Sequence, residues 1–266
     1  MLANYHTHTY RCNHADGTDE EYVKKAIAED VKILGFSDHA PNAPRADGYR
    51  SYYKMAPEEV EEYYTSIRSL AEKYSEQIEL HTGFETEYFR STWKNEVEFM
   101  KKHPPEYLIL GQHYVDFERL NGVQGNHSDR GHSLCDDKER IKPYADIVIE
   151  AMSTELFSCI AHPDILTYTG KEQEYYLSEM ARIIEASKKY GVPLEYNLLG
   201  QALGRQYPRR DFWQLAGELG APAVLGCDAH NPERVAVKEE ILEAEKLLSE
   251  CNVKILETIE LRKPFK

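Results

Sequence analysis

The chain has 266 residues, of which 32 are Lys or Arg and 46 are Asp or Glu, and its formal net charge is −14. This acidity argues against binding to nucleic acid or to an anionic membrane surface, because both need a basic surface on the protein. The sequence contains no tract of about eighteen apolar residues, so we expect no helix that spans a membrane.

Seven apolar runs of strand length follow one another along the chain, and segments with helical spacing separate them. The runs cover residues 2–8, 32–38, 78–85, 107–115, 157–162, 193–197 and 222–227. Strands that alternate with helices in this way indicate parallel βαβ units. Neither a repeat nor a linker divides the chain, and its length is normal for one α/β barrel, so we expect a single domain of residues 1–266.

Helices are predicted between these strands, over residues 19–34, from 57 onward, and over 92–102, 137–156, 172–190, 210–219 and 232–250. Thr18 or Asp19 is the expected N-cap of the first helix, and Gly35 its expected stop. Pro57 opens the second helix, where acidic residues follow in the first turns and suit the helix dipole.

Six of the seven predicted strands end on an imidazole or a carboxylate. These residues are His6 and His8, Asp38 and His39, Glu85, His113, His162 and Asp164, and Asp228 and His230. Chemistry gathers at the carboxyl ends of parallel strands, whereas a histidine buried for packing has no reason to prefer that end. Side chains from so many strands converge only if the sheet curls round. The pattern therefore favours a barrel over an open sheet.

The residue types at these ends are those that bind metal ions. His6 and His8 are two apart in a strand, so both imidazoles can point to one face. Asp228 and His230 repeat this spacing with a carboxylate, the alternative being a loop-capping aspartate followed by an exposed histidine. Glu85 ends an apolar strand and needs a cation or an arginine partner to offset its burial.

Other residues near the expected barrel mouth are candidates for substrate contact. Arg205 follows the sixth strand and is our candidate for binding a phosphate through its planar guanidinium. Residues 116–137 form a long polar stretch that we expect to overhang the mouth. Its His127 and His132 are expected to be solvated loop residues, with contact to substrate as the alternative.

The N-terminal residues lack a basic segment followed by an apolar one, so no secretory signal is expected. The five cysteines are widely spaced, odd in number and without a Cys-x-x-Cys pair. This pattern suits a reducing compartment better than a disulfide framework. We therefore expect a cytoplasmic protein.

The strand-end residues, together with His14, form a set that resembles the polymerase and histidinol phosphatase (PHP) superfamily over essentially the whole chain. It comprises His6-x-His8, His14, Asp38-His39, Glu85, His113, His162 and Asp228-x-His230. Finer motifs are similar to its histidinol-phosphate phosphatase branch, namely Cys12-Asn13-His14-Ala15-Asp16-Gly17, Phe36-Ser37-Asp38-His39, Ala161-His162-Pro163-Asp164, Tyr207-Pro208 and Asp228-Ala229-His230-Asn231-Pro232.

The resemblance implies a distorted seven-stranded βα barrel, similar to a TIM barrel, with three divalent metal ions at its mouth. It assigns His6, His8, Glu85 and Asp228 to a first ion, Glu85, His113 and His162 to a second, and His14, His39 and His230 to a third. Asp16 is the alternative to His14. Zinc, iron and manganese all suit such ligands, and availability often decides among them. Asp38 or Asp164 is expected to orient the ligand imidazoles.

Two motifs depart from the histidinol-phosphate branch. This chain has Gly200-Gln201-Ala202, with Arg205 three residues on, where members often carry Gly-Leu-Arg. It has Leu110-Gly111-Gln112-His113 where Gly-Ser-Val-His is common. The departures leave the predicted metal ligands untouched and concern the phosphate clamp and the pocket for the leaving group.

The resulting hypothesis is a metal-dependent phosphomonoesterase that converts L-histidinol phosphate to L-histidinol and phosphate in histidine biosynthesis. A water that bridges the first two ions would lose a proton near neutral pH and attack phosphorus in line. Glu85, Asp228 and His230 are the expected catalytic residues and Arg205 the substrate-binding one. The alternatives are a phosphatase for another small phosphoester, such as a sugar or nucleotide phosphate, and a non-catalytic domain stabilised by metal. The sequence predicts no oligomeric state.

Overall fold

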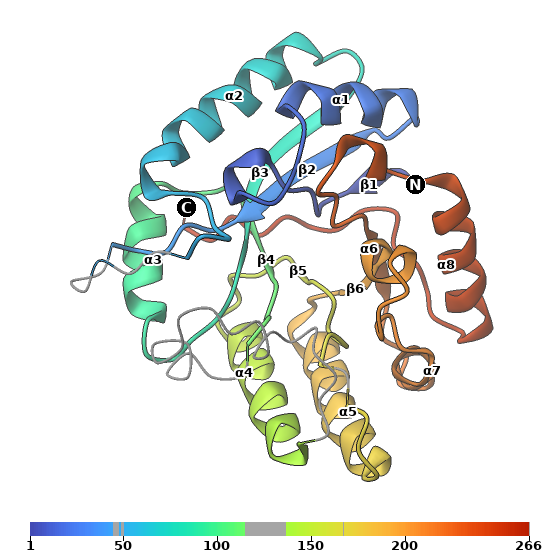
Figure 1. The fold of residues 1–266 in the computed structure, drawn as a ribbon. Helices are drawn as coiled ribbons and strands as arrows, with labels where there is room; N and C mark the ends of the chain where they lie inside the picture. Colours follow the sequence, from blue (N-terminus) through green and yellow to red (C-terminus); the bar gives the residue numbers. More distant parts are fainter. Residues whose placement is uncertain (45–47, 49–50, 115–136, 167, 266) are drawn as a thin grey trace.

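Seven parallel strands form one sheet in the computed structural model, which describes residues 1–44, 48, 51–114, 137–166 and 168–265. The strands follow chain order across the sheet and lie at the centre of the molecule (Figure 1). They are β1 (Ala3–Asn4), β2 (Ile33–His39), β3 (Glu79–Thr86), β4 (Tyr107–Leu110), β5 (Cys159–Ile160), β6 (Leu194–Asn197) and β7 (Ala223–Gly226). Every adjacent pair is parallel.

The last strand returns to the first, so the sheet closes on itself. Thr7, beyond β1, forms a parallel bridge with Ala229, beyond β7. The His8 amide donates to the Ala229 carbonyl at 3.0 Å, and the Ala229 amide donates to the His6 carbonyl at 3.3 Å. β1 and β5 have only two residues each, which makes the barrel irregular. The predicted fold, a distorted seven-stranded α/β barrel, is confirmed.

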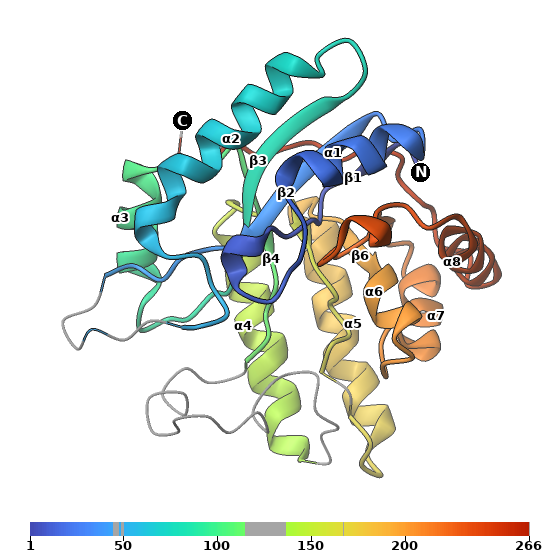
Figure 2. The ribbon, with the colours of Figure 1, turned by 45° about the horizontal axis from the view of Figure 1, so that its top comes forward.

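Helices surround the strands on the outside of the barrel, as Figures 1 and 2 show. The α-helices are α1 (Asp19–Ala28), α2 (Val60–Lys73), α3 (Trp93–Lys102), α4 (Ile141–Ser153), α5 (Gln173–Tyr190), α6 (Leu198–Ala202), α7 (Arg210–Glu218) and α8 (Lys238–Glu250). Short 3-10 turns are η1 (Tyr10–Cys12), η2 (Pro57–Glu59), η5 (Lys138–Arg140) and η6 (Pro232–Arg234). No helix in the described ranges has both the length and the apolar character needed to cross a membrane.

The first predicted helix begins as expected but ends early. Thr18 caps α1 through a capping box with Glu21. The predicted extent of 19–34 is wrong, because α1 ends at Ala28 and Asp30 has a left-handed backbone (φ 61°). Gly35 does not stop the helix, since it lies in β2. A Cβ at Gly35 would lie 2.3 Å from the Tyr107 hydroxyl, so glycine is needed there to admit the tyrosine ring.

A small apolar cluster fills the barrel interior below the carboxyl ends of the strands. It contains Ala3, Tyr5, Tyr107, Ile109, Cys159, Ala161 and Val224. The Tyr107 hydroxyl donates to the Tyr5 carbonyl at 2.9 Å, which ties β4 to the chain after β1. Ile259 and Leu261 pack against this cluster from residues 253–262, which we call the floor segment.

The floor segment crosses the amino ends of several strands. Its Lys254 carbonyl accepts from the Ala223 amide at 2.9 Å, at the start of β7. Its Arg262 amide donates to the Ser158 hydroxyl at 2.9 Å, just before β5. The barrel is thus covered at the amino ends of its strands, opposite the end that carries the predicted ligands.

A buried ion-pair network holds η1 against the first two helices. Arg11, whose side chain is 1% exposed, donates two hydrogen bonds to Asp19 at 2.9 and 2.8 Å and two to Glu62 at 2.7 and 3.0 Å. Asp19 opens α1, and Glu62 lies in α2. The network fixes the turn between His8 and His14, so it links helix packing to the strand-end residues.

Replacing Arg11 tests how much this network stabilises the fold. We expect Arg11→Ala to lower the free energy of unfolding by about 3–5 kcal/mol, because Asp19 would keep a buried charge without its counter-ion. The matched control is Arg90→Ala, which removes an exposed arginine paired with Glu150 and should cost about 0–1 kcal/mol. Urea unfolding in the presence of a chelator measures both. Equal losses for the two variants would contradict this account.

Candidate metal centre

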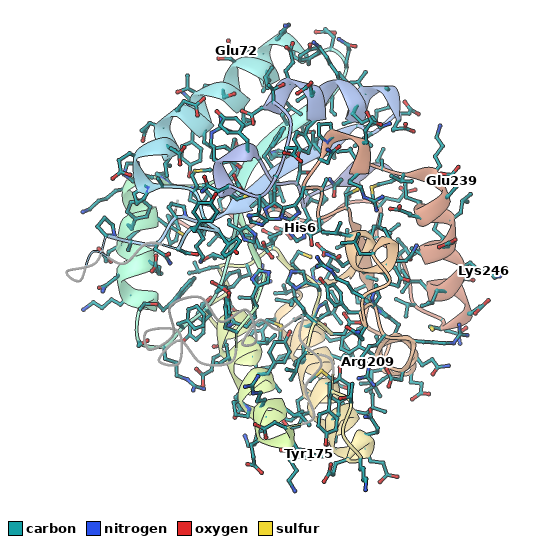
Figure 3. The ribbon with its side chains drawn as sticks, in the orientation of Figure 1. His6, Glu72, Tyr175, Arg209, Glu239 and Lys246 are labelled. Atoms are coloured by element: carbon teal, nitrogen blue, oxygen red, sulfur yellow. The ribbon has the colours of Figure 1, made fainter. Side chains whose placement is uncertain are left out.

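The nine predicted metal ligands all lie at the carboxyl end of the barrel. His6 is at the centre of the molecule, while surface residues such as Glu72, Tyr175 and Lys246 ring the periphery (Figure 3). The elements that carry the ligands are β2 and β3, the segments just after β1, β4, β5 and β7, and the turn after η1. Ligand atoms from these residues form groups in which every atom lies within 4.8 Å of the others.

The first group is His6, His8 and Asp228, all buried. The Nε2 atoms of the two histidines face each other at 3.1 Å. Asp228 Oδ1 lies 3.5 Å from His6 Nε2 and 3.1 Å from His8 Nε2. Glu85 Oε2 is 3.7 and 3.6 Å from the same two nitrogens. Four candidate ligand atoms, from β3 and from the segments after β1 and β7, therefore lie close together.

The second group is Glu85, His113 and His162. Glu85 Oε1 lies 3.0 Å from His162 Nε2 and 3.5 Å from His113 Nε2. The two oxygens of Glu85 thus face different groups, Oε2 the first and Oε1 the second. Gly111 makes room for this carboxylate, because a Cβ there would lie 1.8 Å from Oε1. Glu85 therefore lies between the two groups, with one oxygen toward each.

The third predicted set, His14, His39 and His230, is divided between two groups that share His230. The ligand atoms of His8, His39 and His230 form one group, and those of Cys12, His14 and His230 form the other, with His14 Nε2 and His230 Nε2 at 3.1 Å. His39 stacks on His14 with ring centroids 5.2 Å apart, while its Nδ1 lies 2.9 Å from Glu85 Oε2. Within the described ranges, the alternative ligand Asp16 joins none of these groups, although its amide donates to the His230 carbonyl at 2.8 Å.

The donor set fits divalent cations. Glu85 Oε2 is buried and accepts no hydrogen bond of good geometry, although His39 Nδ1 lies only 2.9 Å away. Two pairs of imidazole nitrogens face each other at 3.1 Å, a distance at which two lone pairs repel unless a proton or a cation lies between them. Imidazole and carboxylate donors together suit zinc, iron or manganese. A cation beside Glu85 Oε2 would give this oxygen a partner, and cations between the facing imidazole nitrogens would remove their repulsion.

The local electrostatics keep the carboxylates charged. Burial opposes ionisation of Glu85, but the charges of His113, His39 and His6 outweigh it and hold the pKa of this carboxyl well below its usual range. The pKa of Asp228 is likewise held low against burial by His6 and His8. Burial and the charge of His8 lower the pKa of His230 to about 3, so this imidazole is neutral and its lone pair can bind a metal.

Five of these imidazoles have an acceptor within 3.5 Å of the outer nitrogen, which leaves Nε2 to face the other ligand residues, although His8 Nδ1 makes no hydrogen bond of good geometry. The Nδ1 distances are 2.7 Å from His6 to Glu195, 3.5 Å from His8 to Asp38, 2.7 Å from His14 to the Cys12 carbonyl, 3.4 Å from His113 to Glu87 and 3.0 Å from His230 to the Asp228 carbonyl. Asp38 thus lies where the sequence predicts an orienting group. Asp164 does not, because its Oδ2 accepts from the Arg209 amide at 2.6 Å.

Several residues at the site were missed from the sequence. Glu87 faces His113 and pairs with Lys54, whose Nζ is 2.9 Å from Oε2. Glu195 and Asn197 lie buried in β6, the strand for which no ligand was predicted. Glu85 and Glu87 are two residues apart in the sequence, as are Glu195 and Asn197. This spacing places both members of a pair on the same face of an extended chain, and it could have identified Glu87, Glu195 and Asn197 as candidates.

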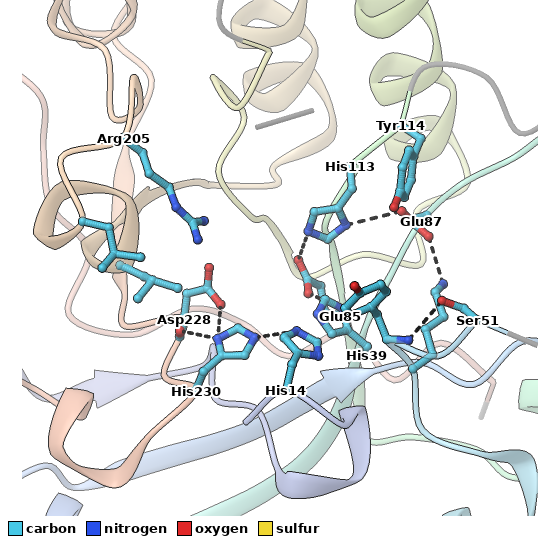
Figure 4. A pocket seen from close by; sticks show the side chains of 14 residues that line it. His14, His39, Ser51, Glu85, Glu87, His113, Tyr114, Arg205, Asp228 and His230 are labelled. Atoms are coloured by element: carbon cyan, nitrogen blue, oxygen red, sulfur yellow. Dashed lines mark hydrogen bonds and ion pairs between the residues drawn. The ribbon is translucent and has the colours of Figure 1, made fainter. Parts of the chain in front are cut away.

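The cluster opens into a pocket of about 380 Å³. Arg205 lies on the Asp228 side of this pocket, and Ser51 and Glu87 lie on the opposite side (Figure 4). Leu199, Leu203, Tyr53 and Lys54 also line the pocket. His127, His132 and the loop 116–137 lie outside the described residues, apart from Asp137, which caps η5.

Comparisons with known proteins give one family and several relatives of similar length. A family model described as PHP domain matches residues 4–198. A probable histidinol-phosphatase of Deinococcus radiodurans is 28% identical over 247 residues, which is 89% of each chain. A probable histidinol-phosphatase of Schizosaccharomyces pombe is 26% identical and covers 98% of this chain and 90% of its own.

One solved structure shares the fold over nearly its whole length. It is histidinol phosphate phosphatase from Lactococcus lactis, in complex with zinc, L-histidinol and phosphate. The TM-score is 0.71 at 18% identity, with 97% of this chain and 98% of the other covered. At this identity the likeness shows a common barrel.

Replacing Glu85 tests its position between two groups. We expect Glu85→Gln to lower the metal content of the first and second groups together, because one neutral amide would replace the charge that faces both. The control is Glu106→Gln, which alters an exposed glutamate paired with His81 and should leave metal content unchanged. Elemental analysis of metal-loaded, desalted protein gives the stoichiometry. Full metal content in Glu85→Gln would show that it bridges nothing.

Proposed function

This chain belongs to the PHP domain family, and on that premise we propose that it is a histidinol-phosphatase, which hydrolyses L-histidinol phosphate to L-histidinol and phosphate. The family match confirms the resemblance seen in the sequence. The names of the relatives from Deinococcus radiodurans and Schizosaccharomyces pombe agree with an enzyme of this type. The proposal places the whole activity in one barrel domain of residues 1–266.

The observation that carries the proposal is the convergence of overlapping groups of histidines and carboxylates, together with an arginine, on one pocket. The proposed ligands are those that the sequence predicts: His6, His8, Glu85 and Asp228 for a first ion, Glu85, His113 and His162 for a second, and His14, His39 and His230 for a third. When bound, such ions activate water as a nucleophile and withdraw charge from phosphoryl oxygens. Their number and identity are part of the proposal.

Arg205 supplies a cation from the protein itself. Its Nη1 donates to the Tyr207 hydroxyl at 2.6 Å, and its guanidinium points toward Asp228 (Figure 4). Tyr207 is buried, so it fixes the direction of this long side chain. The remaining N–H groups of Arg205 are proposed to donate to the phosphoryl oxygens. Gln201 is directed elsewhere, because its Nε2 donates to the Glu240 carbonyl at 3.1 Å.

The rest of the pocket would hold the alcohol part of the substrate. Leu199 and Leu203 contribute apolar side chains to the lining of the pocket. The Lys54–Glu87 ion pair, also in the lining, offers both a donor and an acceptor to a polar ligand. This combination suits a small phosphoester with polar substituents. The changed motif at Gly200–Ala202 keeps another small phosphoester, such as a sugar or nucleotide phosphate, as the second candidate.

A substrate panel tests the proposal directly. We expect phosphate release from L-histidinol phosphate with a kcat/KM at least about a hundredfold above that for sugar phosphates, nucleotides and an aryl phosphate, since each well-placed polar contact contributes a factor of about ten. The assay uses metal-reconstituted protein and measures released phosphate. Equal and slow turnover of all substrates would remove the histidinol-phosphatase assignment and leave the metal centre in place.

Arg205→Ala tests the phosphate contact. We expect kcat/KM to fall about 100-fold or more, because a charge-assisted hydrogen bond in the pocket is lost. Arg210→Ala is the control, since Arg210 is exposed and pairs with Glu250 on the surface. Steady-state kinetics and metal analysis are measured for both. A loss of metal that matches the loss of rate would mean that Arg205 does not act on the substrate.

A further inference from the structure

We infer that β6, the strand without a predicted metal ligand, positions the ligands of the first group through Glu195 and Asn197. The two residues are positioning residues, because they contact His6 and Asp228 and lie outside the ligand groups. The inference rests on the proposed function only in taking His6 and Asp228 as ligands of an ion. In this inference the buried carboxylate of Glu195 determines which nitrogen of His6 faces the ion. The buried amide of Asn197 determines which oxygen of Asp228 does so.

Glu195 holds His6 in one orientation. Its side chain is 2% exposed, and its Oε2 lies 2.7 Å from His6 Nδ1. An ionised carboxylate only accepts hydrogen bonds, so Nδ1 must carry the hydrogen whenever Nε2 binds a cation. Nε2 is then the nitrogen with a free lone pair, and it is the atom that faces His8 and Asp228. Glu195 thereby selects the tautomer of His6.

The other oxygen of Glu195 is also occupied. Oε1 accepts from Asn197 Nδ2 at 2.7 Å and from the His162 amide at 3.4 Å. The first contact fixes the plane of the carboxylate. The second reaches a residue of the second group, which has a left-handed backbone (φ 31°). One carboxylate therefore connects the chain after β1 to the chain after β5.

Asn197 holds Asp228 in the same way. It is fully buried, and its Nδ2 donates to Asp228 Oδ2 at 3.1 Å as well as to Glu195. Its Oδ1 accepts from the Gly200 amide at 2.8 Å, which caps α6. With Oδ2 engaged, Asp228 presents Oδ1 to the nitrogens of His6 and His8. The amide has no freedom to flip, because both ends of it have partners.

The neighbouring strand is shaped to admit the carboxylate. Gly226 in β7 pairs with Asn197 in β6, and a Cβ at Gly226 would lie 2.2 Å from Glu195 Oε2. Its φ is outside the left-handed region, so a side chain there would act by steric displacement. Gly226→Ala therefore offers a way to move Glu195 while keeping its charge.

The test measures metal binding without substrate. Glu195→Gln keeps the size of the side chain but replaces an acceptor by an amide that can donate as well, so the tautomer of His6 is no longer selected. We expect zinc affinity at the first group to fall about 10- to 100-fold, which is the range found for partners of metal-bound histidines. Metal binding at the other groups should be retained. Competition with a chromophoric chelator measures this. Nitrogen-15 NMR of His6 should show loss of the single Nδ1–H form.

Glu179→Gln is the matched control, because Glu179 is a buried carboxylate in α5 that pairs with Arg182. We expect it to bind zinc like the unmodified chain. Gly226→Ala should reproduce the effect of Glu195→Gln, and it keeps the test decisive if the latter variant misfolds. Zinc affinity and a His6 tautomer unchanged in both variants would overturn the inference. Normal metal binding by the unmodified chain, without release of phosphate from L-histidinol phosphate, would overturn the proposed function and leave this inference intact.

Discussion

Charged carboxylates buried at the end of the barrel are the constraint on which the rest of the structure depends. Glu85, Asp228 and Glu195 are each at most 5% exposed, and an isolated buried carboxylate is prohibitively costly. Each has at least one imidazole nitrogen within 4 Å, and the histidines come from strands all round the barrel. The barrel must therefore close, since an open sheet would hold these partners apart.

The imidazoles can serve as partners of these buried carboxylates only if each ring is held with the correct nitrogen toward the centre. Backbone carbonyls orient His14 and His230, whereas carboxylates face the outer nitrogens of His6, His8 and His113. The centre is thus a set of ligands surrounded by a second layer of acceptors. Glycines at 111 and 226 leave the space in which Glu85 and Glu195 can lie. Orientation and space, more than the number of donors, distinguish this site from an ordinary cluster of histidines.

Much of this arrangement could be predicted from the sequence. Strand ends were recognisable because polar residues followed apolar runs, and parallel strands bring such ends together. Glu195 and Asn197, two of the residues missed, have the spacing of residues on one face of a strand, but this spacing alone does not indicate metal binding. Their role depends on contacts with His6 and Asp228, at positions far away in the chain. The early end of α1 was missed because its apolar spacing continues into β2.

The closure between β1 and β7 has a consequence for synthesis on the ribosome. Glu195 lies 189 residues after His6, and the Cys227 amide donates to Asn4 across 223 residues. At roughly 5–20 residues per second, translation takes about 10 s or more to bring these partners together. Throughout that time the nascent β1 lacks its partner at one edge, and the carboxylates of β6 and β7 do not yet exist. The residues of the first group therefore come together only after nearly the whole chain has been made, so the chain's first strand must wait for almost its last.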